Sequence, residues 1–277
     1  MGQSRPRFLQ CGRFHLPLSR PLIAGIVNVT PDSFSDGGSS ATTAEAVAHA
    51  LRLFDEGADI VDVGGESTRP GASLVAVDEE LRRVLPVLER LPDVPVSIDT
   101  GKPAVMRAAI ERGACMVNDI RALRVPGALE AVAASNAAVC LMHMQGEPQT
   151  MQAAPHYDDV VAEVRMFLRE RVAAALAAGI GAARLVVDPG FGFGKSFEHS
   201  LALLRDLQEL NELGVALMVG LSRKSMLGKI TGREAGDRVH ASVAAALLAV
   251  AKGARIVRVH DVRATRDALA VYNALQD

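Results

Sequence analysis

Residues 94–120 read VPVSIDTGKPAVMRAAIERGACMVNDI, and the fold prediction starts from this stretch. An apolar run, Val94–Asp99, is followed by a helical pattern, Pro103–Arg112, and then by a second apolar run, Met116–Ile120. Gly113 stands between helix and strand, where glycine commonly caps a helix because it adopts the left-handed conformation without strain. Nearly continuous apolar runs are typical of strands covered on both faces, so the stretch predicts a strand–helix–strand unit of a parallel sheet.

The same alternation continues in both directions along the chain. Strands are predicted at Leu22–Val29, Ile60–Gly64, Val94–Asp99, Met116–Ile120, Val139–Met144, Arg184–Asp188, Ala216–Leu221 and Arg255–His260. Helices are predicted at Ala44–Glu56, Asp78–Leu91, Pro103–Arg112, Gly127–Ala134, Asp158–Ala178, Phe197–Leu210, His240–Lys252 and Thr265–Leu275.

Eight strand–helix units in about 250 residues fit an α/β protein with a (β/α)8 TIM barrel. An open, doubly wound sheet is the alternative, but eight units are many for that fold and no GxGxxG follows the first strand. No linker divides the chain, so we expect an N-terminal extension over 1–20 and a single barrel domain over 21–277.

The composition limits the class of protein. The 277 residues carry a net charge of −2; 49% are hydrophobic, and 4% are aromatic with no Trp. This balance argues against a nucleic-acid binder and against disorder. The three cysteines, Cys11, Cys115 and Cys140, lack CxxC spacing, so neither a disulfide framework nor a zinc site is expected. No signal-peptide pattern or bilayer-length apolar run is present, which predicts a soluble cytoplasmic protein without a membrane partner.

Polar side chains stand at the end of each predicted strand. They are Asn28, Asp62 with Glu66, Asp99, Asn118 with Asp119, His143, Asp188, Ser222 with Lys224, and Arg258 with His260. In a barrel these strand ends converge on the face that carries active sites. Buried polar groups without partners cost kilocalories each, so polar residues that interrupt apolar runs favour one shared site over simple strand ends.

Two long loops follow the first two strands. NVTPDSFSDGG at 28–38 is rich in turn residues, which predicts an irregular loop that closes over a substrate. DVGGESTRPG at 62–71 combines a glycine pair with Thr68 and Arg69, a hydroxyl and a planar cation suited to phosphate or carboxylate.

The later strand ends leave several alternatives open. Asp99, Asn118 and Asp188 suit either a metal ion or a planar heterocycle that presents several N–H donors. Lys224 fits a Schiff-base lysine or a hydrogen-bond donor. Phe193, in the glycine-rich loop after the sixth strand, packs either on a flat substrate ring or in the loop base. Arg258 and His260, two residues apart, point to one side of their strand as a diphosphate clamp would.

Together these motifs resemble the dihydropteroate synthase family over nearly the whole chain. The resemblance is carried by NVTPDSFSDGG (28–38), DVGGESTRPG (62–71), IDT (98–100), NDI (118–120), DPGFGFGK (188–195), SRKS (222–225) and RVHDV (258–262). It implies a (β/α)8 pterin-binding barrel and a transferase of an alkyl group other than methyl. That enzyme joins 6-hydroxymethyl-7,8-dihydropterin diphosphate to 4-aminobenzoate in folate biosynthesis, with Mg²⁺ as cofactor.

The resemblance also implies residue roles. The pterin would be bound by Asp99, Asn118, Asp188 and Lys224, and the diphosphate by Asn28, Thr68, Arg258 and His260, with Asn28 also a ligand of Mg²⁺. The 4-aminobenzoate pocket would contain Thr68, Arg69, Pro70, Phe193 and Ser225, and catalysis would depend on Asp99, Lys224, Arg258 and His260.

In the roles that the resemblance implies, none of these residues acts as a covalent nucleophile or a strong base, which suggests an SN1-like displacement. Local cations, counted as Arg69, Lys224, Arg258 and His260, would then stabilise the departing diphosphate. Two alternatives to this function remain: a non-catalytic pterin-binding homologue and a pterin-dependent methyltransferase barrel. The resemblance further implies a sulfonamide target and a homodimer. The small-residue helix His240–Lys252 is a candidate interface, and burial of this helix within the monomer is the alternative.

Overall fold

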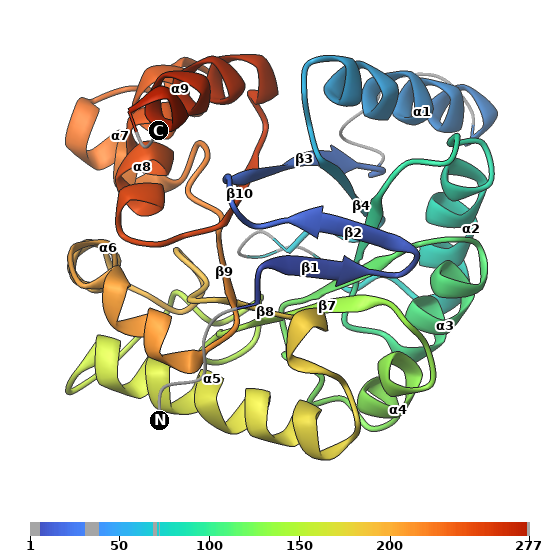
Figure 1. Ribbon diagram of the computed structural model, residues 1–277, viewed down its shortest axis with the longest axis horizontal. Coiled ribbons are helices and arrows are strands. Elements are labelled where there is room, and N and C mark those ends of the chain that lie inside the picture. Colours follow the sequence, from blue (N-terminus) through green and yellow to red (C-terminus); the bar gives the residue numbers. More distant parts are fainter. Residues whose placement is uncertain (1–5, 31–38, 69–70, 72, 276–277) are drawn as a thin grey trace.

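A computed structural model describes residues 6–30, 39–68, 71 and 73–275. Eight parallel strands close into a barrel in the order β10-β3-β4-β5-β6-β7-β8-β9, with helices around it (Figure 1). The barrel strands are β3 (Leu22–Asn28), β4 (Ile60–Gly64), β5 (Val96–Asp99), β6 (Met116–Asp119), β7 (Ala138–Met142), β8 (Leu185–Asp188), β9 (Ala216–Val219) and β10 (Ile256–Val259). The predicted (β/α)8 barrel is confirmed.

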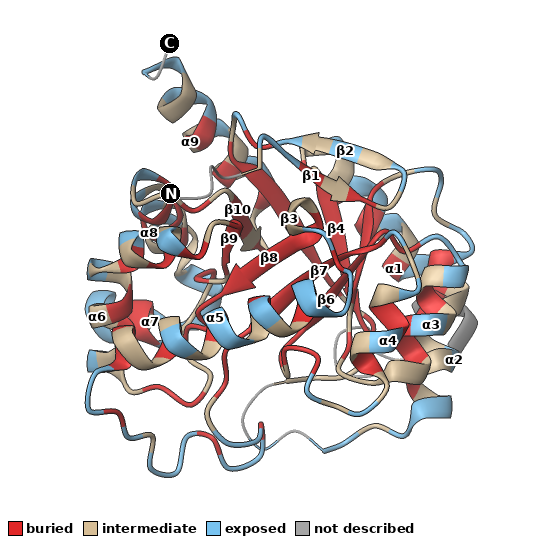
Figure 2. Cartoon of the chain, turned by 60° about the horizontal axis from the view of Figure 1, so that its bottom comes forward, coloured by how far each residue is buried: buried red, intermediate tan, exposed pale blue. Residues whose placement is uncertain are grey.

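The helices cover the outside of the barrel, and their red inner and blue outer faces in Figure 2 show which side is buried. They are α1 (Ser39–Asp55), α2 (Val77–Leu88), α3 (Pro103–Glu111), α4 (Ala128–Ala133), α5 (Val160–Ala177), α6 (Phe197–Arg205), α7 (Ser225–Thr231), α8 (Val239–Ala251) and α9 (Val262–Ala274). Short 3₁₀ turns form η2 (Ala182–Arg184), η3 (Leu207–Leu213) and η4 (Ala235–Asp237). No helix within the described ranges is long and apolar enough to cross a membrane.

Three elements differ from the sequence prediction. The helix expected over Phe197–Leu210 ends at Arg205 and continues as the 3₁₀ helix η3. The seven-residue helix α7 was not predicted, because Gly228 and its short length hide the helical period. The predicted N-terminal extension contains an antiparallel hairpin of β1 (Phe8–Cys11) and β2 (Phe14–Pro17).

Alternate residues of each barrel strand face its interior, as the two-residue period of a strand requires. In β4, Val61 and Val63 pack among residues of the surrounding helices, whereas Ile60 belongs to the cluster inside the barrel. Asp62 shares the inward side with Ile60, two residues earlier. The interior is therefore apolar at the N-terminal ends of the strands and becomes polar toward their C-terminal ends.

The hairpin closes the N-terminal end of the barrel and crosses it in Figure 1. Leu9 and Cys11 of β1 are fully buried against interior residues such as Met116. The Sγ atoms of Cys11 and Cys115 lie 3.0 Å apart, and all three cysteines are free and buried. In this structure the thiols serve as packing groups at the N-terminal end of the barrel.

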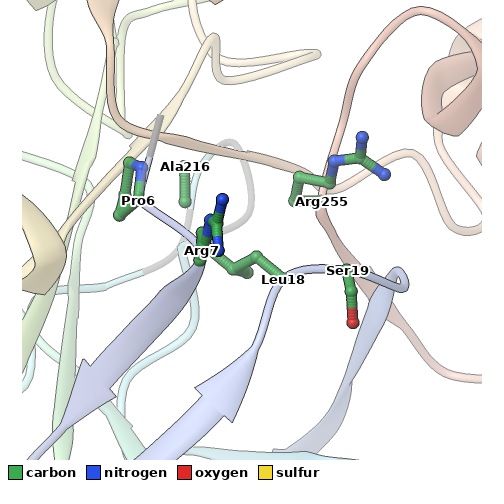
Figure 3. A pocket seen from close by; sticks show the side chains of 6 residues that line it. All are labelled: Pro6, Arg7, Leu18, Ser19, Ala216 and Arg255. Atoms are coloured by element: carbon green, nitrogen blue, oxygen red, sulfur yellow. The ribbon is translucent and has the colours of Figure 1, made fainter. Parts of the chain in front are cut away.

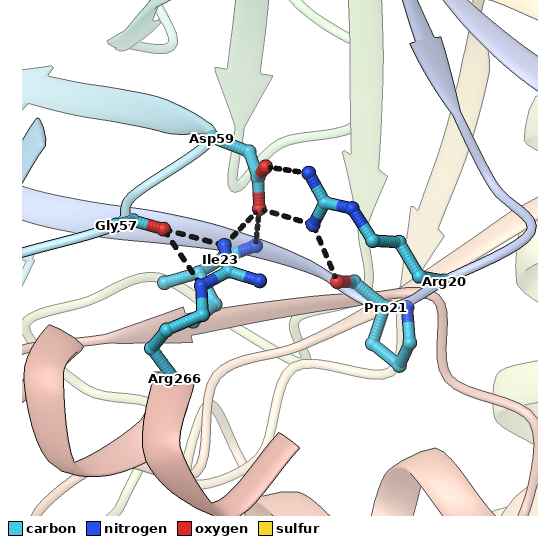
Figure 4. A network of polar contacts seen from close by, with 6 residues as sticks. All are labelled: Arg20, Pro21, Ile23, Gly57, Asp59 and Arg266. Atoms are coloured by element: carbon cyan, nitrogen blue, oxygen red, sulfur yellow. Dashed lines mark hydrogen bonds and ion pairs between the residues drawn. The ribbon is translucent and has the colours of Figure 1, made fainter. Parts of the chain in front are cut away.

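A carboxylate network joins the first and last elements of the barrel (Figure 4). Asp59 accepts hydrogen bonds from Arg20 Nη2 at 2.6 Å, from the Ile23 backbone N–H at 2.8 Å and from Arg266 Nη2 of α9 at 2.6 Å. Arg266 also donates through Nε to the carbonyl of Gly57 at 3.0 Å. The Asp59 carboxylate therefore connects Arg20, in the linker after the hairpin, with β3 and α9.

A hollow of about 340 Å³ also lies at the N-terminal end (Figure 3). Its lining includes Arg7 beside the hairpin, Ala216 at the start of β9 and Arg255 just before β10. None of the polar residues predicted for the site lines it, so the hollow is separate from the functional end of the barrel.

Candidate active site

The C-terminal ends of the strands bring together the polar residues that the sequence predicted. The parallel register pairs Asn28 of β3 with Gly64, Gly64 with Asp99 of β5, and Asp99 with Asn118 of β6. Asp188 ends β8, on the other side of β7 from β6. Side chains from four strands thus meet at one end of the barrel, as expected from the barrel geometry.

Arg258 links two of these carboxylates. Its Nε donates to Oδ2 of Asp62 at 2.6 Å, and its Nη2 donates to Oδ2 of Asp99 at 2.7 Å. The side chains are 21% exposed for Arg258, 2% for Asp62 and 13% for Asp99. Burial alone would lower the pKa of Arg258, but the charges of Asp62 and Asp99 raise it instead. The guanidinium is therefore held as a fixed cation between two strands.

The environment of Asp99 opposes its ionisation. Burial raises its pKa to about 7, and the charges of Asp62, Glu80 and Asp119 also raise it, while Arg258 lowers it. Asp99 therefore changes protonation state close to neutral pH, which is the range where a carboxyl group can respond to a bound substrate.

Asp188 and Lys224 form an oppositely charged pair of binding groups. Oδ1 of Asp188 accepts from the Gly190 backbone N–H at 2.7 Å. Burial raises the pKa of Asp188 to about 6, while the Gly190 hydrogen bond and the charge of Lys224 lower it. Burial also lowers the pKa of Lys224 to about 8, and Arg258 contributes to that shift. Near neutral pH the site therefore offers a carboxylate acceptor and an ammonium donor together.

Phe193 lies beside Lys224. The Lys224 Nζ stands 4.3 Å from the centroid of the Phe193 ring, a cation–π contact. The ring also packs against a small cluster that contains Met142 and Met144 at the end of β7. Phe191, by contrast, is only 1% exposed and belongs to the core between barrel and helices. Of the two aromatic residues in the loop, only Phe193 is therefore placed at the site.

His260 is positioned by Ser222. Its Nδ1 lies 3.0 Å from the Ser222 Oγ, which also accepts from the His260 backbone N–H at 3.2 Å. Burial, together with the cations Arg223 and Arg258, lowers the pKa of His260 to about 4. The imidazole is therefore neutral at pH 7, and counting it among the local cations was wrong.

The remaining predicted residues lie at the rim. Asn28 is half-buried at the end of β3, and Thr68 is half-buried in the loop after β4. Ser225 is exposed at the first position of α7. Arg69, Pro70 and the part of the first loop over 31–38 lie outside the described residues.

Sequence reasoning missed the supports of these loops. Lys195 is buried, with Nζ 2.9 Å from His143 Nδ1 and 2.9 Å from the Phe193 carbonyl, and so fixes the glycine-rich loop. Glu66 accepts from the Val75 backbone N–H at 2.7 Å and from Lys102 Nζ at 2.8 Å, which closes the stem of the second loop. Lys195 and Glu66 both stand inside the motifs that carried the resemblance, but their partners are distant in sequence.

No group of three or more His, Cys, Asp or Glu side chains able to hold a metal ion occurs in the described part of the chain. The donor set around Asn28 therefore does not fit a metal site built from protein ligands alone. It does fit Mg²⁺ held mainly by phosphate oxygens and water, because that ion often needs only one or two protein oxygens.

Comparisons with known proteins place the chain among pterin-binding barrels. Residues 24–260 match the family described as pterin binding enzyme. The dihydropteroate synthase of Neisseria meningitidis serogroup B is 53% identical over 275 residues, with 96% of each chain covered. The structure of the Xanthomonas albilineans dihydropteroate synthase with 4-aminobenzoic acid superposes with a TM-score of 0.92, at 58% identity and 98% coverage of each chain. The Burkholderia cenocepacia dihydropteroate synthase with bound 7,8-dihydropteroate gives a TM-score of 0.89 at 52% identity, over 98% of this chain and 97% of that one.

Proposed function

The chain belongs to the pterin binding enzyme family and, within it, to the dihydropteroate synthases, and on this premise we propose how its barrel site performs the reaction. The enzymes of this family join 6-hydroxymethyl-7,8-dihydropterin diphosphate to 4-aminobenzoate. The products are 7,8-dihydropteroate, an intermediate of folate biosynthesis, and diphosphate.

One observation carries the assignment of the pterin site. Hydrogen-bond acceptors on β5, β6 and β8 converge: the carboxyl groups of Asp99 and Asp188, and the buried Oδ1 of Asn118, which has no partner among the described residues. A dihydropterin ring presents its 2-amino group and ring N–H groups as donors. Since unpaired buried acceptors cost free energy, binding a donor-rich ring edge relieves a cost that the protein alone bears.

Lys224 supplies the complementary donor. Its ammonium group stands over the Phe193 ring and interacts with the charge of Asp188. It would donate a hydrogen bond to the 4-oxo group of the ring, while Asp188 would accept hydrogen bonds from the 2-amino group and a ring N–H group. With one donor and three acceptors, the site distinguishes a pterin from a ring whose donors and acceptors are exchanged.

Arg258, His260, Asn28 and Thr68 would hold the diphosphate. Arg258 stays charged across the working pH range, and the neutral His260 would act as a hydrogen-bond donor through Nε2, because its Nδ1 faces Ser222. Asn28 would hold Mg²⁺ through its side-chain oxygen. When bound, that ion would neutralise charge on the diphosphate and so improve the leaving group.

The chemistry that fits these residues is an SN1-like displacement. The bond between the pterin methylene carbon and the diphosphate oxygen breaks as Arg258 stabilises the departing anion. Asp99, ionised next to Arg258, stabilises the positive charge that develops on the methylene. The amine of 4-aminobenzoate then forms the new C–N bond and loses one proton to solvent.

We assign the 4-aminobenzoate pocket to Phe193 and Ser225 from the described residues, together with Thr68, Arg69 and Pro70 of the second loop. The Phe193 ring offers a flat apolar wall at the mouth, next to the pterin donor Lys224. Sulfonamides that carry a 4-aminophenyl group share the aniline of the substrate and would compete for this pocket.

The assay for this function is diphosphate release. The chain should release diphosphate from the pterin substrate only when both 4-aminobenzoate and Mg²⁺ are present. Release that 4-aminobenzoate does not stimulate would contradict the assignment, and a non-catalytic pterin-binding protein would release none.

We also propose that the enzyme acts as a homodimer in the cytoplasm, where its three free cysteines would stay reduced. The interface is assigned to α8 and α9, which pack side by side and expose Leu248 (56%) and Val271 (67%). On a sizing column the chain should elute as a dimer, and Leu248→Glu should shift it toward the monomer. A wild-type chain that elutes as a monomer at micromolar concentration would contradict this assignment.

A further inference from the structure

Asp62 of β4 contacts residues of the proposed site but is not itself among the residues proposed to bind the pterin ring. Its side chain points into the barrel from β4 and is 2% exposed. Its Oδ2 accepts two hydrogen bonds, one from Arg258 Nε at 2.6 Å and one from Asn118 Nδ2 at 3.1 Å. One oxygen atom therefore fixes two groups of the proposed site, which belong to strands on opposite sides of β4 in the barrel.

The contact determines how the Asn118 amide is oriented. A carboxylate can only accept hydrogen bonds, so the Asn118 side chain must turn its NH₂ group toward Asp62. The other end of the amide, Oδ1, is then left on the opposite side. Asn118 is 5% exposed, and this Oδ1 is buried without a partner among the described residues.

Without Asp62, the hydrogen bond that fixes the orientation of the Asn118 amide would be lost. An Asn side chain can rotate by a half-turn and exchange its donor and acceptor at almost no steric cost, because the two ends have nearly the same shape. The flipped amide would present NH₂ to the N–H donors of the pterin edge. Two donors would then face each other in a buried site, and neither would be satisfied.

We propose that Asp62 is a positioning residue that makes Asn118 a hydrogen-bond acceptor, so that the site selects a ring edge with an N–H donor. Asp62 itself does not touch the substrate and acts through Asn118. The same carboxylate fixes Arg258, so the ring site and the leaving-group site share one anchor. This inference rests on the proposed function, since it takes the pterin ring as the ligand.

The test is a double-mutant cycle read by calorimetry with 6-hydroxymethyl-7,8-dihydropterin, the ligand without its diphosphate. This ligand lacks the diphosphate, so contacts between Arg258 and the leaving group do not enter the measured affinity. An effect that reached the ring through Arg258 and Asp99 would appear as an added loss in the double variant. Asp62→Ala should weaken binding about tenfold, the cost of one mismatched buried hydrogen bond. Asn118→Ala should weaken it by a similar or larger factor.

The double variant Asp62→Ala/Asn118→Ala should bind no more weakly than Asn118→Ala alone, because Asp62 acts through the amide that is already gone. Asp62→Asn, which keeps an acceptor oxygen for Asn118, should stay within about threefold of the wild type. If Asp62→Ala does not fold, Asp62→Asn takes its place in the cycle. Its ring affinity is then measured in a chain that contains Asn118 and in the Asn118→Ala chain.

Asp59→Ala is the matched control. It removes another aspartate that pairs with arginines, 11% exposed and at the opposite end of the barrel, and should leave ring affinity unchanged. Asp62→Ala binding like the wild type, or losses that multiply in the double variant, would overturn the inference. A chain that binds the ring but forms no dihydropteroate would contradict the proposed reaction, while the cycle would still decide the role of Asp62.

Discussion

Replacing Arg258 by alanine removes the cation that joins two carboxylates at the mouth of the barrel. Asp62 would lose its 2.6 Å partner and Asp99 its 2.7 Å partner. Breaking a buried ion pair from one side typically costs about 3–5 kcal/mol, because the remaining charge stays buried. Since Arg258 is 21% exposed and water can partly replace it, we expect the lower end, about 3 kcal/mol.

The loss of stability should depend on pH. The native pKa of Asp99 is raised to about 7 by burial despite Arg258, so ionised Asp99 destabilises the fold as pH rises above its unfolded value. Without Arg258 that pKa rises further, and protonation at low pH relieves the unpaired charge. The destabilisation of Arg258→Ala should therefore be largest near pH 8 and smaller near pH 5.

The effect on catalysis separates the two roles of Arg258. Loss of a preorganised group that stabilises developing charge usually lowers kcat by at least a hundredfold. Urea unfolding gives the stability and steady-state diphosphate release gives kcat. The matched control is Arg266→Ala, which breaks the 2.6 Å ion pair with Asp59 far from the site and should reduce stability while leaving kcat unchanged. An Arg258→Ala variant with the wild-type free energy of unfolding, or with full kcat, would refute the roles given to Arg258 beside Asp62 and Asp99.

Four further outcomes are expected. Asp188→Ala should weaken binding of the pterin ring at least a hundredfold by calorimetry, since a charged acceptor is lost; unchanged affinity would exclude its role. Because burial raises the pKa of Asp188 to about 6 and of Asp99 to about 7, and lowers that of Lys224 to about 8, kcat/KM should fall on either side of this range. A flat profile from about pH 5 to about pH 9 would show that these groups do not control the reaction. Phe193→Ala should raise KM for 4-aminobenzoate about tenfold with pterin affinity unchanged; an effect on the pterin instead would reassign the ring. Asp59→Ala should lower the free energy of unfolding by about 3 kcal/mol, and a loss of kcat per folded molecule would show that the N-terminal network reaches the site.

The barrel could be predicted from the sequence because its signals are local. Each strand is a short apolar run, and glycines such as Gly113 end the helices that precede strands. The hairpin of β1 and β2 escaped prediction because its four-residue strands carry charged and polar neighbours and bury mainly Leu9 and Cys11. Its role in closing the barrel depends on contacts with residues a hundred positions away, which no local pattern contains.

The site residues could likewise be located but not connected. Strand-end positions identified Asp62, Asp99 and Arg258 as polar groups at one end, since every parallel strand ends there. Which carboxylates pair with Arg258 depends on the register of β4, β5 and β10, and the sequence does not specify it. The neutral state of His260 depends on its burial beside Arg223 and Arg258, so it too required the folded chain.

The most direct test of the account measures both products of one reaction. The chain, incubated with 6-hydroxymethyl-7,8-dihydropterin diphosphate, 4-aminobenzoate and Mg²⁺, should form 7,8-dihydropteroate and diphosphate in equal amounts, and Arg258→Ala should slow both equally. Diphosphate release without 7,8-dihydropteroate, or no release in the presence of all three components, would contradict the claim that this barrel end joins the two substrates.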